Sequence, residues 1–158
     1  MSDLREALEE AGFEDVRTYV QSGNVVLTSK ASAKQVESDV RRLLADRFGL
    51  DIAVVVRTRA ELAAVVKRNP LGKVATNPKL YQVTFLEKAP TAELVRKLEA
   101  VAVGKEQVAH IGRQLYAWHP DGVARSKLAA LMAGKGLGVT ATARNWRTVT
   151  KLHELAEQ

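Results

Sequence analysis

Residues that are β-branched or aromatic gather in two short runs near the start of the chain, Val16–Val20 and Asn24–Thr28. A Gln-Ser-Gly-Asn corner separates the two runs. Gly23 and Asn24 adopt a positive φ at the least steric cost, so a tight reversal of the chain belongs at this corner. The pattern therefore predicts a β-hairpin around it.

Helical patterns flank this hairpin on both sides. Apolar residues recur at helical spacing from Asp3 to Ala11 and again from Ser32 to Phe48. Ile52–Val56 is a nearly unbroken β-branched run, apolar on both faces, which predicts a strand in the middle of a sheet. The spacing of Thr58 and Glu61 predicts a capping box that opens a short helix.

The second half of the chain begins after an irregular stretch, Arg68–Pro78, which we expect to be a hinge. Its pattern predicts two helices, a hairpin that turns at Gly112-Arg113, and a closing helix. In order, the predicted elements are a strand at Leu80–Leu86, a helix at 90–101, strands at Val108–Ile111 and Gln114–His119, and helices at 123–133 and 146–157.

The order of these elements predicts an α+β protein with two ferredoxin-like (split βαβ) lobes, residues 1–68 and 69–158, and antiparallel-rich sheets. The first lobe lacks its opening strand. In such a lobe that strand lies between the second hairpin strand and the final strand. Without it, Val25–Leu27 and Ile52–Val56 would each present an unpaired apolar edge, through which a homodimer is one expectation.

Composition narrows the class of protein. The 158 residues are 46% hydrophobic and 27% charged, as in ordinary globular domains. No apolar run approaches the roughly 20 residues of a membrane span, and the N-terminus has no signal-peptide core. The absence of cysteine excludes disulfides, thiolate metal sites and cysteine nucleophiles. We expect a cytoplasmic location.

The net charge of +6 is distributed unevenly along the sequence. Residues 1–50 hold 7 basic and 9 acidic side chains, whereas residues 122–158 hold 6 and 2. No carboxylate side chain occurs from Gly122 to His153. This asymmetry indicates an anionic partner. The alternative is a solvated basic face that only aids solubility.

Several segments resemble one family, nearly from end to end. The most specific are Gly12–Val26, which contains Gly-Phe-Glu-Asp-Val-Arg-Thr-Tyr-Val-Gln-Ser-Gly-Asn-Val-Val, and Thr142–Trp146, which reads Thr-Ala-Arg-Asn-Trp. Weaker matches are Leu4–Leu8, Arg47–Leu50, Asn69-Pro70, Pro120–Gly122 and Arg125–Leu128. The family is the domain of unknown function 1697 family. The resemblance implies a two-lobed α+β protein with ferredoxin-like topology and brings no established activity.

One departure from the family concerns the start of the chain. Family members typically begin with a strand and a glycine-rich turn, and Met1 here stands where an internal residue would be expected. We therefore expect a shortened start, whether from the choice of gene start, from the fragment chosen, or as a true variant. We therefore do not expect this chain to carry out a function that depends on the glycine-rich turn.

The first candidate site surrounds the start of the closing helix. Asn145 stands at its N-cap position, so free backbone amides and the positive end of the helix point outward there. Arg144 and Arg147 flank them, which is the chemistry of a phosphate or carboxylate pocket. We hypothesise that Arg125, Ser126 and Lys127 converge on the same point. Alternatively, Asn145 is only a cap and Trp146 only a core residue.

Two further groups of residues suggest ligand contacts. Gln21, Ser22 and Asn24 place amide and hydroxyl groups at the hairpin corner, although such residues also serve simply as turns. Tyr116 and Trp118 lie two residues apart on a predicted strand and so share a face, as base stacking requires. The alternative is that both rings belong to the core.

No catalytic, metal-binding or cofactor-binding pattern stands out. His110, His119 and His153 have no carboxylate or cysteine at ligand spacing, so we expect no metal. No paired carboxylates suggest acid–base chemistry, and we expect no cofactor. The leading hypothesis is a non-catalytic module that binds an anion, either nucleic acid or a phosphorylated ligand. The alternatives are a small-molecule enzyme with a cleft between lobes and an interaction protein that pairs through exposed strands.

Overall fold

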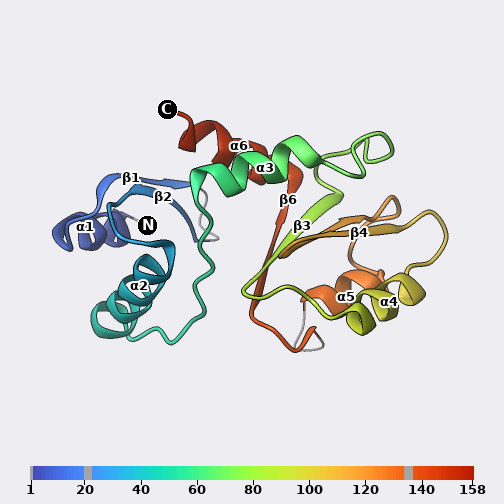
Figure 1. The fold of residues 1–158 in the computed structure, drawn as a ribbon, viewed down its shortest axis with the longest axis horizontal. Coiled ribbons are helices and arrows are strands. Elements are labelled where there is room, and N and C mark those ends of the chain that lie inside the picture. Colours follow the sequence, from blue (N-terminus) through green and yellow to red (C-terminus); the bar gives the residue numbers. More distant parts are fainter. Residues whose placement is uncertain (1, 20–22, 134–136) are drawn as a thin grey trace. The chain divides into compact units, whose positions relative to one another are not determined.

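The described residues of the computed structural model, 2–19, 23–133 and 137–158, form two units (Figure 1). The first unit comprises residues 1–63 and 151–158, and the second comprises residues 64–150. The described part of the chain contains six helices and two antiparallel sheets, an α+β architecture. Where the sequence suggested one boundary at 68/69, the units divide inside helix α3 (Arg59–Arg68) and again inside helix α6 (Trp146–Ala156).

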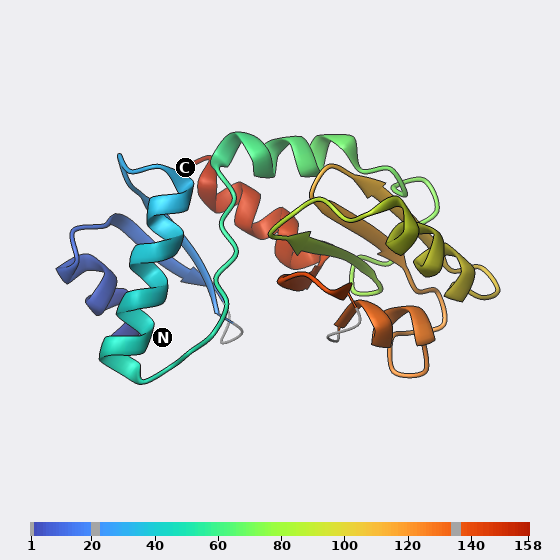
Figure 2. The ribbon, with the colours of Figure 1, turned by 60° about the horizontal axis from the view of Figure 1, so that its bottom comes forward.

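The predicted hairpin is the sheet of the first unit. Strands β1 (Glu14–Tyr19) and β2 (Asn24–Thr28) pair antiparallel, and Gly23 has a φ of 83°. Helices α1 (Ser2–Glu10) and α2 (Ala33–Phe48) pack against this hairpin (Figure 2). The small core between them is apolar, because both helices direct their hydrophobic faces toward it; its buried members are Leu8, Phe13, Val16 and Val36.

The predicted strand at Ile52–Val56 is wrong, because the structure assigns no strand between α2 and α3. The sheet beside it has two strands, β1 and β2, so no third strand in the described part of the chain provides backbone partners for residues 52–56. Val56 contacts the small core, whereas Leu50 and Ile52 are 45% and 51% exposed. A β-branched run alone is therefore insufficient for a strand when a pairing edge is missing.

Side-chain caps begin helices α2 and α3, and the capping box predicted at Thr58 and Glu61 is confirmed. Thr58 Oγ1 accepts a hydrogen bond from Glu61 N at 3.1 Å, and Glu61 Oε1 accepts one from Thr58 N at 2.9 Å. This is a complete capping box at the start of α3. Ser32 caps α2 through Gln35 N, but the Gln35 side chain donates to Asp39 instead of returning to the cap.

The second unit is a complete ferredoxin-like fold. Its elements run β3 (Tyr81–Leu86), α4 (Ala92–Val101), β4 (Gln107–Ile111), β5 (Gln114–Trp118), α5 (Lys127–Ala133) and β6 (Ala141–Asn145). The strands form one antiparallel sheet in the order β4-β5-β3-β6, which is the split βαβ topology. The sequence had not predicted β6, which fills the edge position beside β3.

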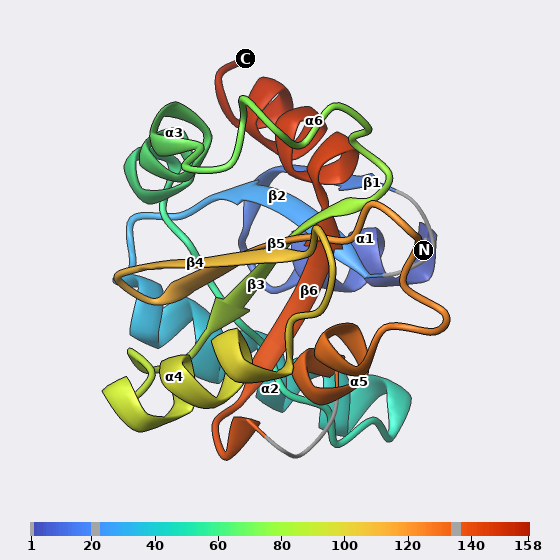
Figure 3. The same cartoon turned by 90° about the vertical axis from the view of Figure 1, so that its right-hand side faces the viewer.

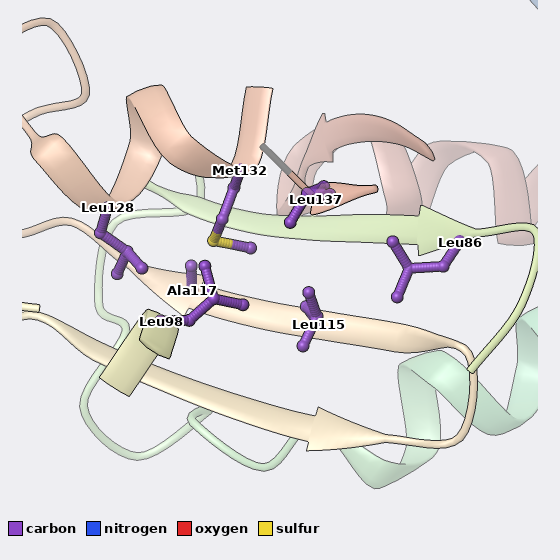
Figure 4. Packing of buried hydrophobic residues seen from close by; sticks show 7 residues of the cluster. All are labelled: Leu86, Leu98, Leu115, Ala117, Leu128, Met132 and Leu137. Atoms are coloured by element: carbon purple, nitrogen blue, oxygen red, sulfur yellow. The ribbon is translucent and has the colours of Figure 1, made fainter. Parts of the chain in front are cut away.

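The register divides the sheet into two faces. Thr84 pairs with Leu115 and Ala143, whereas Val83 pairs with Tyr116 and so belongs to the opposite face. Helices α4 and α5 cover the Leu115 face (Figure 3). Their apolar side chains interdigitate with those of β3 and β5 in a core cluster shown in Figure 4. Its buried members are Leu86, Leu98, Leu115, Ala117, Leu128, Met132 and Leu137.

Aromatic rings occupy the Tyr116 face. The rings of Tyr81 and Trp146 stack with centroids 4.9 Å apart at 27°, so the first residue of α6 is held against β3. Tyr116 Oη donates to the carbonyl of Val65 in α3 at 3.0 Å. Burial is the main cause that raises the pKa of Tyr81 and of Tyr116 to about 12, so both rings stay neutral across the physiological range.

We expect Leu115→Ala to lower the free energy of unfolding of the second unit by about 2–5 kcal/mol, because it leaves a cavity between the sheet and α5. Both tryptophans, Trp118 and Trp146, belong to this unit, so urea unfolding followed by tryptophan fluorescence reports on it. Val103→Ala is the matched control, since Val103 is 63% exposed. Equal losses in the two variants would contradict the assigned core.

Candidate anion-binding surface

One end of the four-stranded sheet gathers four separate segments of the second unit. Tyr81 pairs with Trp118, Trp118 pairs with Gln107, and Gln82 pairs with Asn145. Strands β3 and β4 therefore begin at the same end at which β5 and β6 finish. In Figure 4, Ala117 and Leu128 lie toward this end, and Leu86 and Leu137 lie toward the other. The segments 69–80, 102–106, 119–127 and 145–147 adjoin the strands at this end, and we call it the cationic end.

Exposed cations are concentrated at the cationic end. The six are Lys73, Lys79, Lys105, Arg125, Lys127 and Arg147, each on the surface. The same segments contain two carboxylates, Glu106 and Asp121. None of the six cations forms an ion pair with a residue that the structure describes. These charges are consequently available to an external anion.

The charge asymmetry of the sequence follows the division into units. Residues 64–150 contain 14 Lys and Arg and 5 Asp and Glu, a net charge of +9. The remaining residues contain 10 and 13, a net charge of −3. The second unit thus carries the whole positive excess, and the field around it attracts anions.

The predicted cap at Asn145 is confirmed. Its Oδ1 accepts a hydrogen bond from Thr148 N at 2.9 Å, and α6 begins at the next residue. Arg147 lies exposed in the first turn of α6, where the positive end of the helix dipole adds to its charge. Asn145 and Arg147 therefore lie at the cationic end, as do Arg125, Ser126 and Lys127.

Arg144 is placed differently from the other predicted residues. It pairs with Val83, so its side chain belongs to the Tyr116 face, opposite the face that α5 covers. Its Nη1 donates to Thr142 Oγ1 and to the carbonyl of Ala143 at 2.8 Å. The side chain is half-buried, and this burial lowers the pKa of the guanidinium. The structure does not bring Arg144 together with Lys127.

The predicted stacking residues Tyr116 and Trp118 share a face, as expected, but they are 0% and 7% exposed. Rings that are buried in this way cannot receive a nucleotide base, so the prediction of a stacking platform is wrong. At the hairpin corner, Gln21 and Ser22 lie outside the described residues. Asn24 is buried, and its Nδ2 donates to the carbonyl of Tyr19 at 3.1 Å.

Sequence reasoning missed a polar cluster at the cationic end. Glu106 Oε2 accepts hydrogen bonds from Ser126 Oγ at 2.5 Å and from His119 Nδ1 at 2.9 Å. Its Oε1 accepts one from Val103 N at 3.3 Å. The side chains of His119 and Glu106 are 0% and 6% exposed. The signal lay in the register, because Glu106 directly precedes β4 and His119 directly follows β5, opposite each other.

This cluster lacks the geometry of a nucleophilic triad. In such triads the hydroxyl contacts one ring nitrogen while the carboxylate holds the other. Here Ser126 and Glu106 both lie on the Nδ1 side of His119, and Ser126 Oγ also accepts from Ala129 N at 3.0 Å. Burial raises the pKa of Glu106, but hydrogen bonds from His119, Ser126 and Val103 N outweigh it and leave that pKa below its usual range. The arrangement holds an ionised carboxylate in place.

The family described as "protein of unknown function (DUF1697)" matches residues 1–116. The chain belongs to this family. The matched region ends within β5, before Arg125–Lys127 and Asn145.

Among solved structures, one similar fold extends over almost the whole chain. It is that of the conserved bacterial protein SP0830 from Streptococcus pneumoniae, with a TM-score of 0.78 and 18% sequence identity over 99% of this chain and 88% of that chain. At this identity the likeness confirms the α+β fold and carries no function. No curated protein matches the chain in sequence.

No helix in the described part of the chain has the length and apolar character that crossing a membrane requires. No group of three or more histidine and carboxylate side chains is arranged to hold a metal ion in that part of the chain.

We expect Glu106→Gln to lower the free energy of unfolding by about 1–3 kcal/mol at pH 7, because the acceptor of these hydrogen bonds loses its charge and they become weaker. The pKa of Glu106 is lowered in the folded state, so its contribution is present above the ordinary carboxylate pKa and is lost as the pH falls through the folded value. The difference between wild type and variant should therefore shrink toward pH 3 in urea titrations. A difference of constant size from pH 7 to pH 3 would contradict this assignment.

Proposed function

We propose that this protein is a non-catalytic module that binds nucleic acid through its phosphate backbone at the cationic end. One observation carries the proposal: six exposed cations without described ion-pair partners lie on four segments that adjoin the same end of a sheet. A polyanion that extends across this end of the sheet would contact several of these segments. Each contact releases counterions, which is the main source of sequence-independent affinity for nucleic acid.

The burial of the sheet supports phosphate contacts over base contacts. Helices α4 and α5 cover one face, and α3 and the start of α6 cover the other, so Tyr116 and Trp118 are enclosed. Single-stranded RNA is commonly bound by stacking bases on exposed aromatics of such a sheet. With that mode closed, the surface cations remain, and phosphate contacts fix position without reading sequence. Duplex nucleic acid is the class of ligand that fits.

The start of α6 adds directional donors to this surface. Asn145 occupies Thr148 N, while the exposed Arg147 and the positive helix end lie beside it. A phosphate located there would receive both a guanidinium and backbone donors. A phosphorylated small molecule would bind at the same point. The salt dependence of binding distinguishes this ligand from nucleic acid.

We expect the triple variant R125E/K127E/R147E to bind a short fluorescein-labelled duplex DNA at least tenfold more weakly than wild type. The plot of log Kobs against log salt should be steep in wild type, with a slope of about −0.9 for each phosphate contacted. Losing three contacts should reduce its magnitude by about 2.7. Fluorescence anisotropy over a salt series measures both quantities.

The matched control is K88E/R96E/K97E, which makes the same change in charge on exposed cations away from the cationic end. We expect it to retain most of the wild-type slope. Equal weakening by both triple variants would mean that net charge alone drives binding and would overturn the proposed surface. A wild-type slope near that of a single contact would overturn nucleic acid as the ligand and favour a small phosphorylated one.

One observation favours the interaction-protein alternative. Phe48, Leu50 and Ile52 occupy every second position at the end of α2 and just after it, in the first unit, and all three are exposed apolar residues. If they form a contact between two copies of the chain, Ile52→Lys should convert a dimer to a monomer, because it places a charge in an apolar interface. Light scattering after size-exclusion chromatography measures this, and a monomeric wild type at high protein concentration would contradict it.

A further inference from the structure

We propose that Glu106 and His119 act as positioning residues that hold Ser126, and through it fix the segment that presents Arg125 and Lys127. We call Glu106, His119 and Ser126 the clasp. The binding test of this inference rests on the proposed function, whereas the proteolysis test of the clasp needs no ligand. The proposal gives a role to a polar cluster that the surface cations do not explain.

The clasp links three segments that are distant in sequence. Glu106 ends the connection from α4, His119 follows β5, and Ser126 precedes α5. Glu106 Oε2 receives both the Ser126 hydroxyl and His119 Nδ1, and its Oε1 receives Val103 N. All donors converge on one carboxylate, so none of the three segments can move without breaking a hydrogen bond to a charged acceptor.

The position of Ser126 makes this link relevant to the surface. Its neighbours on both sides are Arg125 and Lys127, both exposed and both at the cationic end. Adjacent residues diverge in direction, so one half-buried, hydrogen-bonded serine between two exposed cations anchors both at a fixed point. An anchored cation loses less conformational freedom when it binds phosphate, which is the general benefit of preorganisation.

The burial of the His119 and Glu106 side chains argues for a role beyond packing. His119 Nε2 is enclosed and has no hydrogen-bond partner among the described residues. With its proton on Nδ1, the ring donates to Glu106 and leaves a bare lone pair at Nε2. A buried polar atom without a partner is costly, so an apolar residue would be the cheaper choice if packing alone mattered.

A simpler role must be separated from this one. Ser126 Oγ also accepts from Ala129 N, so it caps α5 as Thr91 Oγ1 caps α4 through Leu94 N. Ser126→Ala removes both the clasp and the cap. Glu106→Gln keeps the cap and weakens only the clasp. Thr91→Ala removes a cap of the same kind in the same unit and leaves the clasp intact.

Limited trypsin digestion of the folded protein tests the clasp directly, because Arg125 and Lys127 are themselves cleavage sites. We expect Ser126→Ala and Glu106→Gln to accelerate cleavage after Arg125 by about tenfold, the factor expected when a hydrogen bond to a charged group is lost. Ser126→Thr should restore the wild-type rate. Thr91→Ala should leave cleavage at Arg125 unchanged. Tryptophan fluorescence confirms that each variant remains folded.

DNA binding by the same variants provides a second test of the clasp. Ser126→Ala and Glu106→Gln should reduce the magnitude of the salt slope by up to about 1.8, the share of two phosphate contacts, while Thr91→Ala leaves it unchanged. Cleavage that is accelerated in Ser126→Ala but unchanged in Glu106→Gln would reduce Ser126 to a helix cap and overturn the clasp. If wild type fails to bind DNA, the proposed function falls, and the proteolysis of the same variants still decides on the clasp.

Discussion

The pairing of β3 with two neighbours is the constraint on which the second unit depends. β3 lies between β5 and β6, and five of its six residues are buried. Because both partners run antiparallel to it, the start of β3 meets the ends of both. The same geometry brings the start of β4 to that end through β5. Cations that are far apart in sequence therefore share one end of the sheet without any dedicated motif.

The position of the carboxylates leaves the cations at this end of the sheet largely unneutralised. The segments at the cationic end contain two acids, and one of them, Glu106, is turned inward onto His119 and Ser126. Its charge is satisfied by internal donors, so less negative charge reaches the surface. The internal carboxylate thus contributes twice, once by ordering the 119–127 segment and once by leaving its cations unneutralised.

Local chemistry was predictable from the sequence, and long-range pairing was not. The Gly23 reversal, the Thr58–Glu61 box and the Asn145 cap follow from groups a few residues apart, and each is confirmed. Strand β6 reads Ala-Thr-Ala-Arg-Asn, which has weak strand preference and forms a strand because β3 offers an edge. The run at 52–56 shows the converse, a strong strand pattern without a partner.

For the candidate site, too, the local features were predictable from the sequence and those that depend on the fold were not. Charge counts and cap spacing located Asn145, Arg147 and the Arg125–Lys127 segment. They gave no sign of which face of β6 Arg144 would occupy, because that depends on register with β3. The contact between Glu106 and Ser126 joins residues brought together only by the fold, and no spacing rule connects them.

The junction between β6 and α6 has no connecting loop, since Asn145 ends the strand and Trp146 begins the helix. The rotation of the helix about its axis is therefore inherited from the strand. Each added residue at this junction would turn Arg147 by about 100° about the helix axis and would separate Trp146 from Tyr81. Insertions and deletions in homologous chains should accordingly fall outside this junction, which is the position least tolerant of insertion.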